Sequence, residues 1–226
     1  MSAGDFGKKL DGLLKRLRAK HPDAQVPIAP QWDGMDAGVR ELVFSVLLWE
    51  SGSEAALRAF DRLRQAFVDG NDLRVALPDE VAEVLGEECP PALERAQRLH
   101  CAMMEIYRRE HRLRLDQLRE VGKREARGYL DSVDGLPEFV RARLALLHLG
   151  GHAIPVDARL LERLGSERVL PEKGGVEAAA GWMERHIHQG EALGVHALFH
   201  AWCEEPAKRR RGGEVTKRPA RRSKAT

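Results

Sequence analysis

The sequence predicts an all-α protein of about ten short helices. Apolar residues recur three and four positions apart over most of the chain, which is the spacing of one buried helix face. No alternation of apolar and polar residues persists over the length of a useful strand. With 226 residues, 43% of them hydrophobic, the chain is long enough for one substantial domain or two small lobes.

The composition predicts a soluble, intracellular protein. No apolar run approaches the roughly eighteen residues of a membrane span, and residues 1–20 are charged throughout, unlike a signal peptide. The cysteines are odd in number and lack paired spacing, so we expect reduced thiols rather than a disulfide framework. They are Cys89, Cys101 and Cys203.

The net charge of +2 is distributed unevenly. Residues 207–226 hold nine Lys or Arg and one acidic residue, which leaves 28 basic and 34 acidic residues in the rest of the chain. A segment this basic is typical of a disordered tail attracted to a polyanion, and we expect nucleic acid as the partner. A solubilising tail is the alternative interpretation. The expected contacts in the tail are Lys208, Arg209, Arg210 and Arg211.

We expect three segments along the chain. We expect a basic amphipathic helix and a proline-rich loop over residues 1–30. The globular domain is expected over residues 31–206, and the tail over residues 207–226. In the domain, Asp36 is suited to cap a central helix. The apolar stripe of that helix consists of Val39, Leu42, Val43, Val46 and Leu47.

Four further helices follow from apolar spacing or from start signals. They are expected over residues 54–67, 78–85, 93–110 and 124–130, the second of them opened by Pro78 or Asp79. Loops are expected at residues 69–72, 86–91 and 173–175, which are rich in Gly, Pro, Asp and Asn.

The segment after residue 130 predicts two helices joined by a tight turn. The first helix ends near Ser132, the turn occupies residues 133–137, and the second helix runs from Glu138 to about Leu149. A glycine pair at 150–151 is suited to a left-handed C-terminal cap. The sequence Ile-Pro-Val-Asp at 154–157 then leads into another helix, and Asp157 stands at its start.

Three segments, residues 41–51, 133–137 and 154–157, resemble in order and spacing the endonuclease III-like superfamily of helix-hairpin-helix DNA glycosylases. The similarity runs from about Arg40 to Cys203. It implies a two-lobed helical fold in which a base is flipped from duplex DNA into a pocket between the lobes.

In this resemblance Asp157 occupies the position of the catalytic aspartate. Cleavage of an N-glycosidic bond develops oxocarbenium character at the sugar, and a nearby carboxylate stabilises that charge or orients the attacking water. The alternative is a purely structural N-cap that accepts from the amides of Arg159 and Leu160. The two roles do not exclude each other.

The resemblance also implies that the hairpin binds a DNA phosphate through backbone amides, with arginines adding charge. The predicted DNA-binding residues of the hairpin and its second helix are Gly135, Leu136, Glu138, Phe139, Arg141 and Arg143. Pro137 replaces the second glycine of the family's turn, so one amide donor is lost.

Other positions depart from the family pattern as well. Phe139 stands where bifunctional members carry the lysine that forms a Schiff base, so we expect no lyase activity. Ser51 replaces the glutamine that fills the gap left by the flipped base. Only Cys203 remains of the four cysteines that hold an iron–sulfur cluster in many relatives, so we expect no cluster. A zinc site at His196, His200 and Cys203 lacks a fourth ligand, so no metal is expected.

We therefore expect a base-excision-repair protein, a monofunctional DNA N-glycosylase that removes a damaged or mismatched base. The alternatives are a non-catalytic DNA-binding relative and a helical protein-interaction module. The expected partner is double-stranded DNA, the expected location is the cytoplasm (at the nucleoid) or the nucleus, and the expected state is a monomer.

Overall fold

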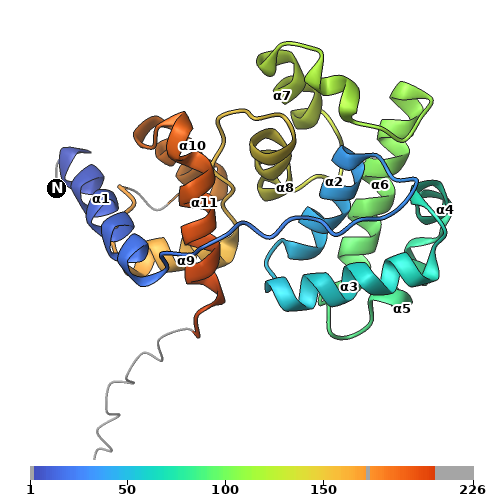
Figure 1. Cartoon of the computed structure of the whole chain (residues 1–226), viewed down its shortest axis with the longest axis horizontal. Helices are drawn as coiled ribbons and strands as arrows, with labels where there is room; N and C mark the ends of the chain where they lie inside the picture. Colours follow the sequence, from blue (N-terminus) through green and yellow to red (C-terminus); the bar gives the residue numbers. More distant parts are fainter. Residues whose placement is uncertain (1–2, 172–173, 207–226) are drawn as a thin grey trace, which may run out of the picture.

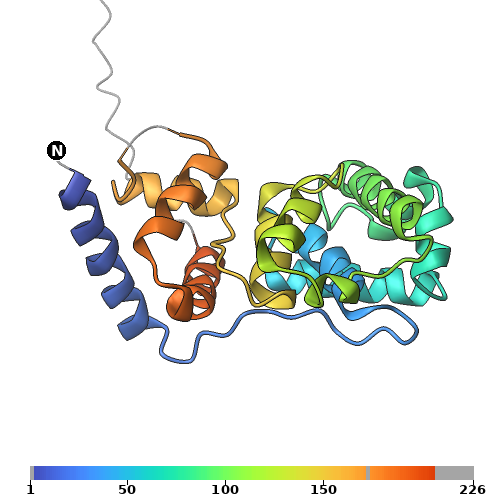
Figure 2. The same ribbon diagram turned by 90° about the horizontal axis from the view of Figure 1, so that it is seen from above.

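The protein folds into two helical lobes (Figures 1 and 2). The structure is a computed structural model that describes residues 3–171 and 174–206, and no strand occurs within those ranges. No helix in these ranges is long and apolar enough to cross a membrane. The helices of the first lobe are α2 (Ala37–Leu48), α3 (Ser53–Ala66), α4 (Gly70–Val75), α5 (Pro78–Leu85), α6 (Ala92–Glu110), η1 (Asp116–Arg119), α7 (Lys123–Asp131), α8 (Glu138–Arg143) and η2 (Leu144–His148). Those of the second lobe are α1 (Ala3–Lys20), α9 (Ala158–Ser166), α10 (Val176–His186) and α11 (Gln189–Glu204).

Helix α2 is the centre of the first lobe. Its predicted apolar stripe is completely buried, because α3, α6, α8 and η2 all pack around it. The predicted cap is also confirmed, since the Asp36 carboxylate accepts from the amide of Val39 at 3.0 Å. The same carboxylate accepts from the amides of Leu115 and Asp116, which ties the start of α2 to η1.

Helix α1 belongs to the second lobe rather than standing outside the globular body. Helix α1 packs against α11. Its four leucines are buried, and they are Leu10, Leu13, Leu14 and Leu17. Residues 21–36, here called the strap, then run along one side of both lobes to α2 (Figure 2). The sequence predicted that the globular domain begins at residue 31. The structure places α1 in the globular body as well, because the apolar face of this helix is covered by α11.

The first lobe contains two helices that the sequence did not predict, α4 and the short 3-10 helix η1. The expected loop at residues 69–72 opens α4 instead. Asp69 accepts from the amides of Asn71 and Asp72 at 2.8 and 2.9 Å, so the turn-forming aspartate acts as an N-cap. The predicted start of α5 is confirmed, with Pro78 in its first turn.

The helix pair after residue 120 follows the prediction closely. Helix α7 ends at Asp131, the turn lies between it and α8, and the chain continues helically through η2 to His148. Gly150 has a φ of +60°, the left-handed conformation expected of a glycine that ends a helix. An extended segment then delivers Asp157 to the start of α9, where the two lobes meet.

A buried ion pair joins the two lobes and the strap. Arg143 on α8 has no exposed side-chain surface, and its Nη2 lies 2.6 Å from Glu41 on α2. The same guanidinium donates to the carbonyl of Pro27 in the strap at 2.8 Å, to Ser45 Oγ at 3.0 Å and to His196 Nε2 on α11 at 2.9 Å. Segments from three distant parts of the sequence, the strap with α2, α8 and α11, thus share one buried cation.

We predict that Arg143→Met lowers the free energy of unfolding by about 3–5 kcal/mol, because Glu41 is left as an unpaired buried charge. Urea denaturation measures this loss. The matched control is Arg108→Met, whose side chain is 72% exposed and whose effect should stay within about 1 kcal/mol.

The double variant Glu41→Met/Arg143→Met should recover part of the lost stability, because it removes both charges together. A double variant that loses as much as the sum of the two single variants would contradict a charge-pairing role.

Candidate active site at the lobe junction

Asp157 is held by both lobes. Its Oδ1 accepts from the amide of Leu160 at 2.8 Å, which makes it the N-cap of α9. Its Oδ2 accepts from the amide of Glu50, in the loop after α2, at 3.2 Å. The amide of Glu50 thus takes the place of the second capping donor that the sequence suggested, the amide of Arg159. Asp157 as a residue is 7% exposed, and the two hydrogen bonds fix the orientation of its carboxylate.

A small cavity lies against this carboxylate. Its volume is about 20 Å³, which is enough for one water molecule and far too small for a nucleobase. Phe139, His196, His200 and Cys203 line it together with Asp157. In this conformation the carboxylate therefore faces a water-sized space.

Phe139 presents a ring where the resemblance places an amine in bifunctional relatives. The ring is 6% exposed and meets the His196 imidazole edge-on, with centroids 6.3 Å apart. Because Arg143 donates to His196 Nε2, that nitrogen is an acceptor and the imidazole is neutral. Burial and the nearby Arg143 lower the pKa of His196 well below its ordinary value.

His200 forms a second polar group in the cavity wall. Its Nε2 lies 2.5 Å from Ser53 Oγ at the start of α3 and 3.5 Å from Glu204. Burial, and then the positive charges of Arg143 and Arg159, lower the pKa of His200 to about 4. His200 is therefore neutral at physiological pH.

The Cys203 thiol is held in its protonated form. Burial, with the neighbouring Asp157 charge, raises its pKa to about 12. A protonated thiol is a poor nucleophile, so Asp157 is the one anionic side chain in this cavity wall.

Arg159 bridges the mouth of the cavity. Its guanidinium donates to the carbonyl of Ser51 in the loop after α2 and to the carbonyl of Cys203 on α11, the latter at 2.6 Å. Ser51 is the position where the family's glutamine was expected. An arginine from α9 thus contacts the loop after α2 at this position.

The hairpin offers backbone donors at the surface of the first lobe. Gly135 has a φ of +86°, and a side chain there would come within 3.0 Å of Cys101 and of the Arg98 carbonyl. Arg98 donates to the Gly135 carbonyl at 3.3 Å. In the described part of the chain, the amides of Gly135, Glu138 and Phe139 have no acceptor within the protein, whereas the amide of Leu136 closes the turn at residues 134–135.

The arginines that follow the hairpin do not lie as the sequence suggested. The prediction that Arg143 contacts DNA is wrong, because its side chain is fully buried against Glu41. Arg141 is half-buried and pairs with Glu138 at 2.8 Å, so its charge is largely neutralised. Burial raises the pKa of Glu138.

The tail residues Lys208, Arg209, Arg210 and Arg211 lie outside the described residues. The last described residue, Pro206, closely follows the end of α11. There, Arg163 on α9 donates to the carbonyl of Glu205, and Arg159 donates to that of Cys203. The body thus ends close to the mouth of the Asp157 cavity.

Metal ligands do not gather in the structure. Within residues 3–171 and 174–206, no three His, Cys, Asp or Glu side chains are placed to hold a metal ion. The three thiols are separate, with Cys89 and Cys203 buried and Cys101 exposed. The Nε2 atoms of His196 and His200 are already engaged by Arg143 and Ser53. The donor set does not fit an iron–sulfur cluster.

Sequence reasoning missed Arg159, His200 and Arg98 as site residues. Arg159 follows Asp157 by two positions, and this proximity was the one local signal available. His200 was considered only as a metal ligand, and Arg98 lies on a helix without any pattern that marks it. Their proximity to the site depends on how α6, α9 and α11 pack.

Solved structures share this fold. The chain matches a trapped endonuclease III–DNA covalent intermediate with a TM-score of 0.68 and 13% identity, over 87% of this chain and 85% of that one. It matches a thermostable thymine-DNA glycosylase with a TM-score of 0.61 and 17% identity, over 90% of each chain. For the 3-methyladenine DNA glycosylase of H. pylori the values are 0.56 and 17%, over 85% of this chain and 92% of that one.

No protein-family model matches the sequence, and no curated protein does. The structural likeness therefore establishes the fold. The predicted all-α, two-lobed architecture is confirmed, and these solved structures share it.

We predict that the free energy of unfolding falls as the pH falls from about 6.5 toward 4. His200 has a depressed pKa of about 4 in the folded protein, whereas an unfolded histidine titrates near about 6.5. Between these values the unfolded chain binds more protons, so each such histidine lowers stability by up to about 1.4 kcal/mol per pH unit. His196 adds to this dependence.

Urea denaturation at several pH values measures the slope. His200→Gln should reduce it, and His188→Gln, at an exposed position, should leave it unchanged. Equal slopes in the two variants would refute the assignment.

Proposed function

We propose that the protein is a monofunctional DNA N-glycosylase. The observation that carries this proposal is the Asp157 carboxylate, held rigidly between the lobes by amides from α9 and from the loop after α2. A fixed anion at this place can stabilise the positive charge that develops on the sugar as the base departs, and can orient a water for attack. The neighbouring water-sized cavity is consistent with hydrolysis.

The residues around the carboxylate support hydrolysis without lyase chemistry. Phe139 and the neutral imidazole of His196 offer no amine to the sugar. The cavity also includes Arg159, but a guanidinium stays protonated and is no nucleophile. Strand cleavage through a Schiff base therefore has no candidate residue in this wall.

Double-stranded DNA is the proposed partner. The unpaired amides around Gly135 can bind a phosphate, and the basic residues after Pro206 can neutralise others. Among the structures that share the fold, one is a covalent complex of endonuclease III with DNA. We further propose a monomer without an iron–sulfur cluster, located at the nucleoid or in the nucleus.

The size of the cavity favours a second candidate function, a DNA-binding protein that has lost catalysis. About 20 Å³ admits no base. Catalysis requires Arg159 to release the Ser51 carbonyl and Phe139 to move aside, so that a flipped base can enter. A protein in which this opening never occurs would bind DNA and cleave nothing.

We predict that the wild-type protein produces abasic sites in a duplex that carries its target base, and that Asp157→Asn reduces this activity by at least about a hundredfold. Single-turnover incubations with uracil, alkylated purines, oxidised bases and mismatches, followed by alkali, reveal the product. Asn keeps one oxygen as a cap, but its NH2 group then faces the other amide donor, that of Leu160 or Glu50, so we expect the free energy of unfolding to fall by about 1–3 kcal/mol.

Asp61→Asn is the matched control, because Asp61 is partly exposed on α3 and pairs with Arg64. Strand cleavage before alkali would contradict monofunctional chemistry. Binding without abasic product on any duplex would favour the non-catalytic alternative.

We predict that removal of residues 207–226 weakens DNA affinity about equally for all sequences and flattens its salt dependence. The slope should fall by about 0.9 for each phosphate that the shortened chain no longer neutralises. Fluorescence anisotropy at several salt concentrations measures both quantities. Replacing the nine Lys and Arg of this segment by Gln at constant length should have the same effect. Unchanged affinity and slope would exclude a role for the tail in binding.

A further inference from the structure

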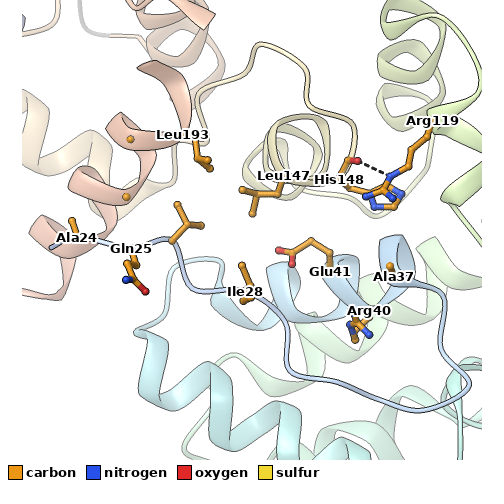
Figure 3. A pocket seen from close by; sticks show the side chains of 13 residues that line it. Ala24, Gln25, Ile28, Ala37, Arg40, Glu41, Arg119, Leu147, His148 and Leu193 are labelled. Carbon is orange, nitrogen blue, oxygen red and sulfur yellow. Dashed lines mark hydrogen bonds between the residues drawn. The ribbon is translucent and has the colours of Figure 1, made fainter. Parts of the chain in front are cut away.

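A second, much larger cavity lies between the strap and the two lobes (Figure 3). Its volume is about 580 Å³, and it shares no lining residue with the cavity at Asp157. Its walls come from the strap, α2, η1, η2 and α11. A space of this volume at a junction of substructures is typical of a small-molecule site.

Apolar side chains face one another across this cavity. Leu193 on α11 and Leu147 on η2 lie opposite Ile28 of the strap (Figure 3). Ile28 is 70% exposed and Leu193 is 51% exposed. Large apolar side chains left in water around a hollow gain free energy when an apolar molecule covers them.

The polar groups of the wall favour an anion. Arg40 and Arg119 both line the cavity, and Glu41, the one carboxylate among the lining residues, is neutralised by Arg143 at 2.6 Å. Burial and the nearby Arg119 lower the pKa of His148, so this wall residue is neutral at physiological pH. The remaining charge on the lining is positive.

One donor in the wall has no acceptor. The Nε of Arg40 is buried and makes no hydrogen bond, although its Nη1 donates to Gln31. This nitrogen has no accessible surface, so a ligand in the cavity meets the positive charge of Arg40 rather than this donor.

We propose that this cavity binds a small amphiphilic anion. Its apolar body packs between Ile28, Leu147 and Leu193, and its carboxylate or sulfonate lies on Arg40 and Arg119. Because the walls come from both lobes and the strap, the bound molecule stabilises their mutual arrangement and raises the melting temperature of the protein. The proposal does not depend on glycosylase activity.

The probe is 8-anilinonaphthalene-1-sulfonate, a flat apolar anion whose fluorescence rises in apolar surroundings. Titration of the full chain should show saturable binding at one site. Leu193→Glu places a negative charge in the wall, which repels the negatively charged sulfonate, and should weaken binding by at least about tenfold. The control Leu57→Glu makes the same change on α3, at a side chain 38% exposed, and should bind as the wild type does.

A second comparison tests the anionic head. Arg40→Met should weaken binding of the sulfonate by about tenfold and leave binding of its neutral analogue N-phenyl-1-naphthylamine within about twofold. Equal weakening of both probes would refute a charge-recognising site. Equal effects of Leu193→Glu and Leu57→Glu, or the absence of saturable binding, would overturn the proposal altogether.

Discussion

The structure depends on one buried cation. Arg143 lies where α2, α8, α11 and the strap meet, and its guanidinium satisfies Glu41, Ser45, His196 and the Pro27 carbonyl together. A buried charge is tolerated only when its partners are in place. The relative position of the two lobes is thus coupled to a hydrogen-bonded network rather than to apolar contact alone.

This constraint reaches both cavities. His196 accepts from Arg143 and lines the cavity at Asp157, whereas Glu41 pairs with Arg143 and lines the cavity at the strap. The hydrogen-bonded network of Arg143 therefore fixes one wall of each cavity. The two cavities differ in kind: one is water-sized and lies against a carboxylate, the other is large, apolar and positively charged. A small cavity beside Asp157 is consistent with a site that opens only when a substrate displaces Arg159.

Much of the helical architecture and the position of Asp157 could be predicted from the sequence. The α2 stripe, the Asp36 cap, the Pro78 start and the glycine at position 150 are local features, because caps and periodicity depend on neighbouring residues. At residues 69–72 the sequence predicted a loop, but the structure has the start of α4 there. Asp and Gly are common both in loops and at helix starts, and only the donors within reach of the Asp69 carboxylate decide between them.

The sequence alone determined that the chain is helical, that a hairpin precedes Asp157 by a fixed distance, and that no amine stands at position 139. The tertiary structure decided which side chains share a site. It buried Arg143, a residue that looked like a surface cation, and brought Arg159 across the lobe junction to Ser51. It also made α1 part of the second lobe. Burial and pairing depend on segments more than a hundred residues apart, and no local pattern encodes which face of one helix will meet another.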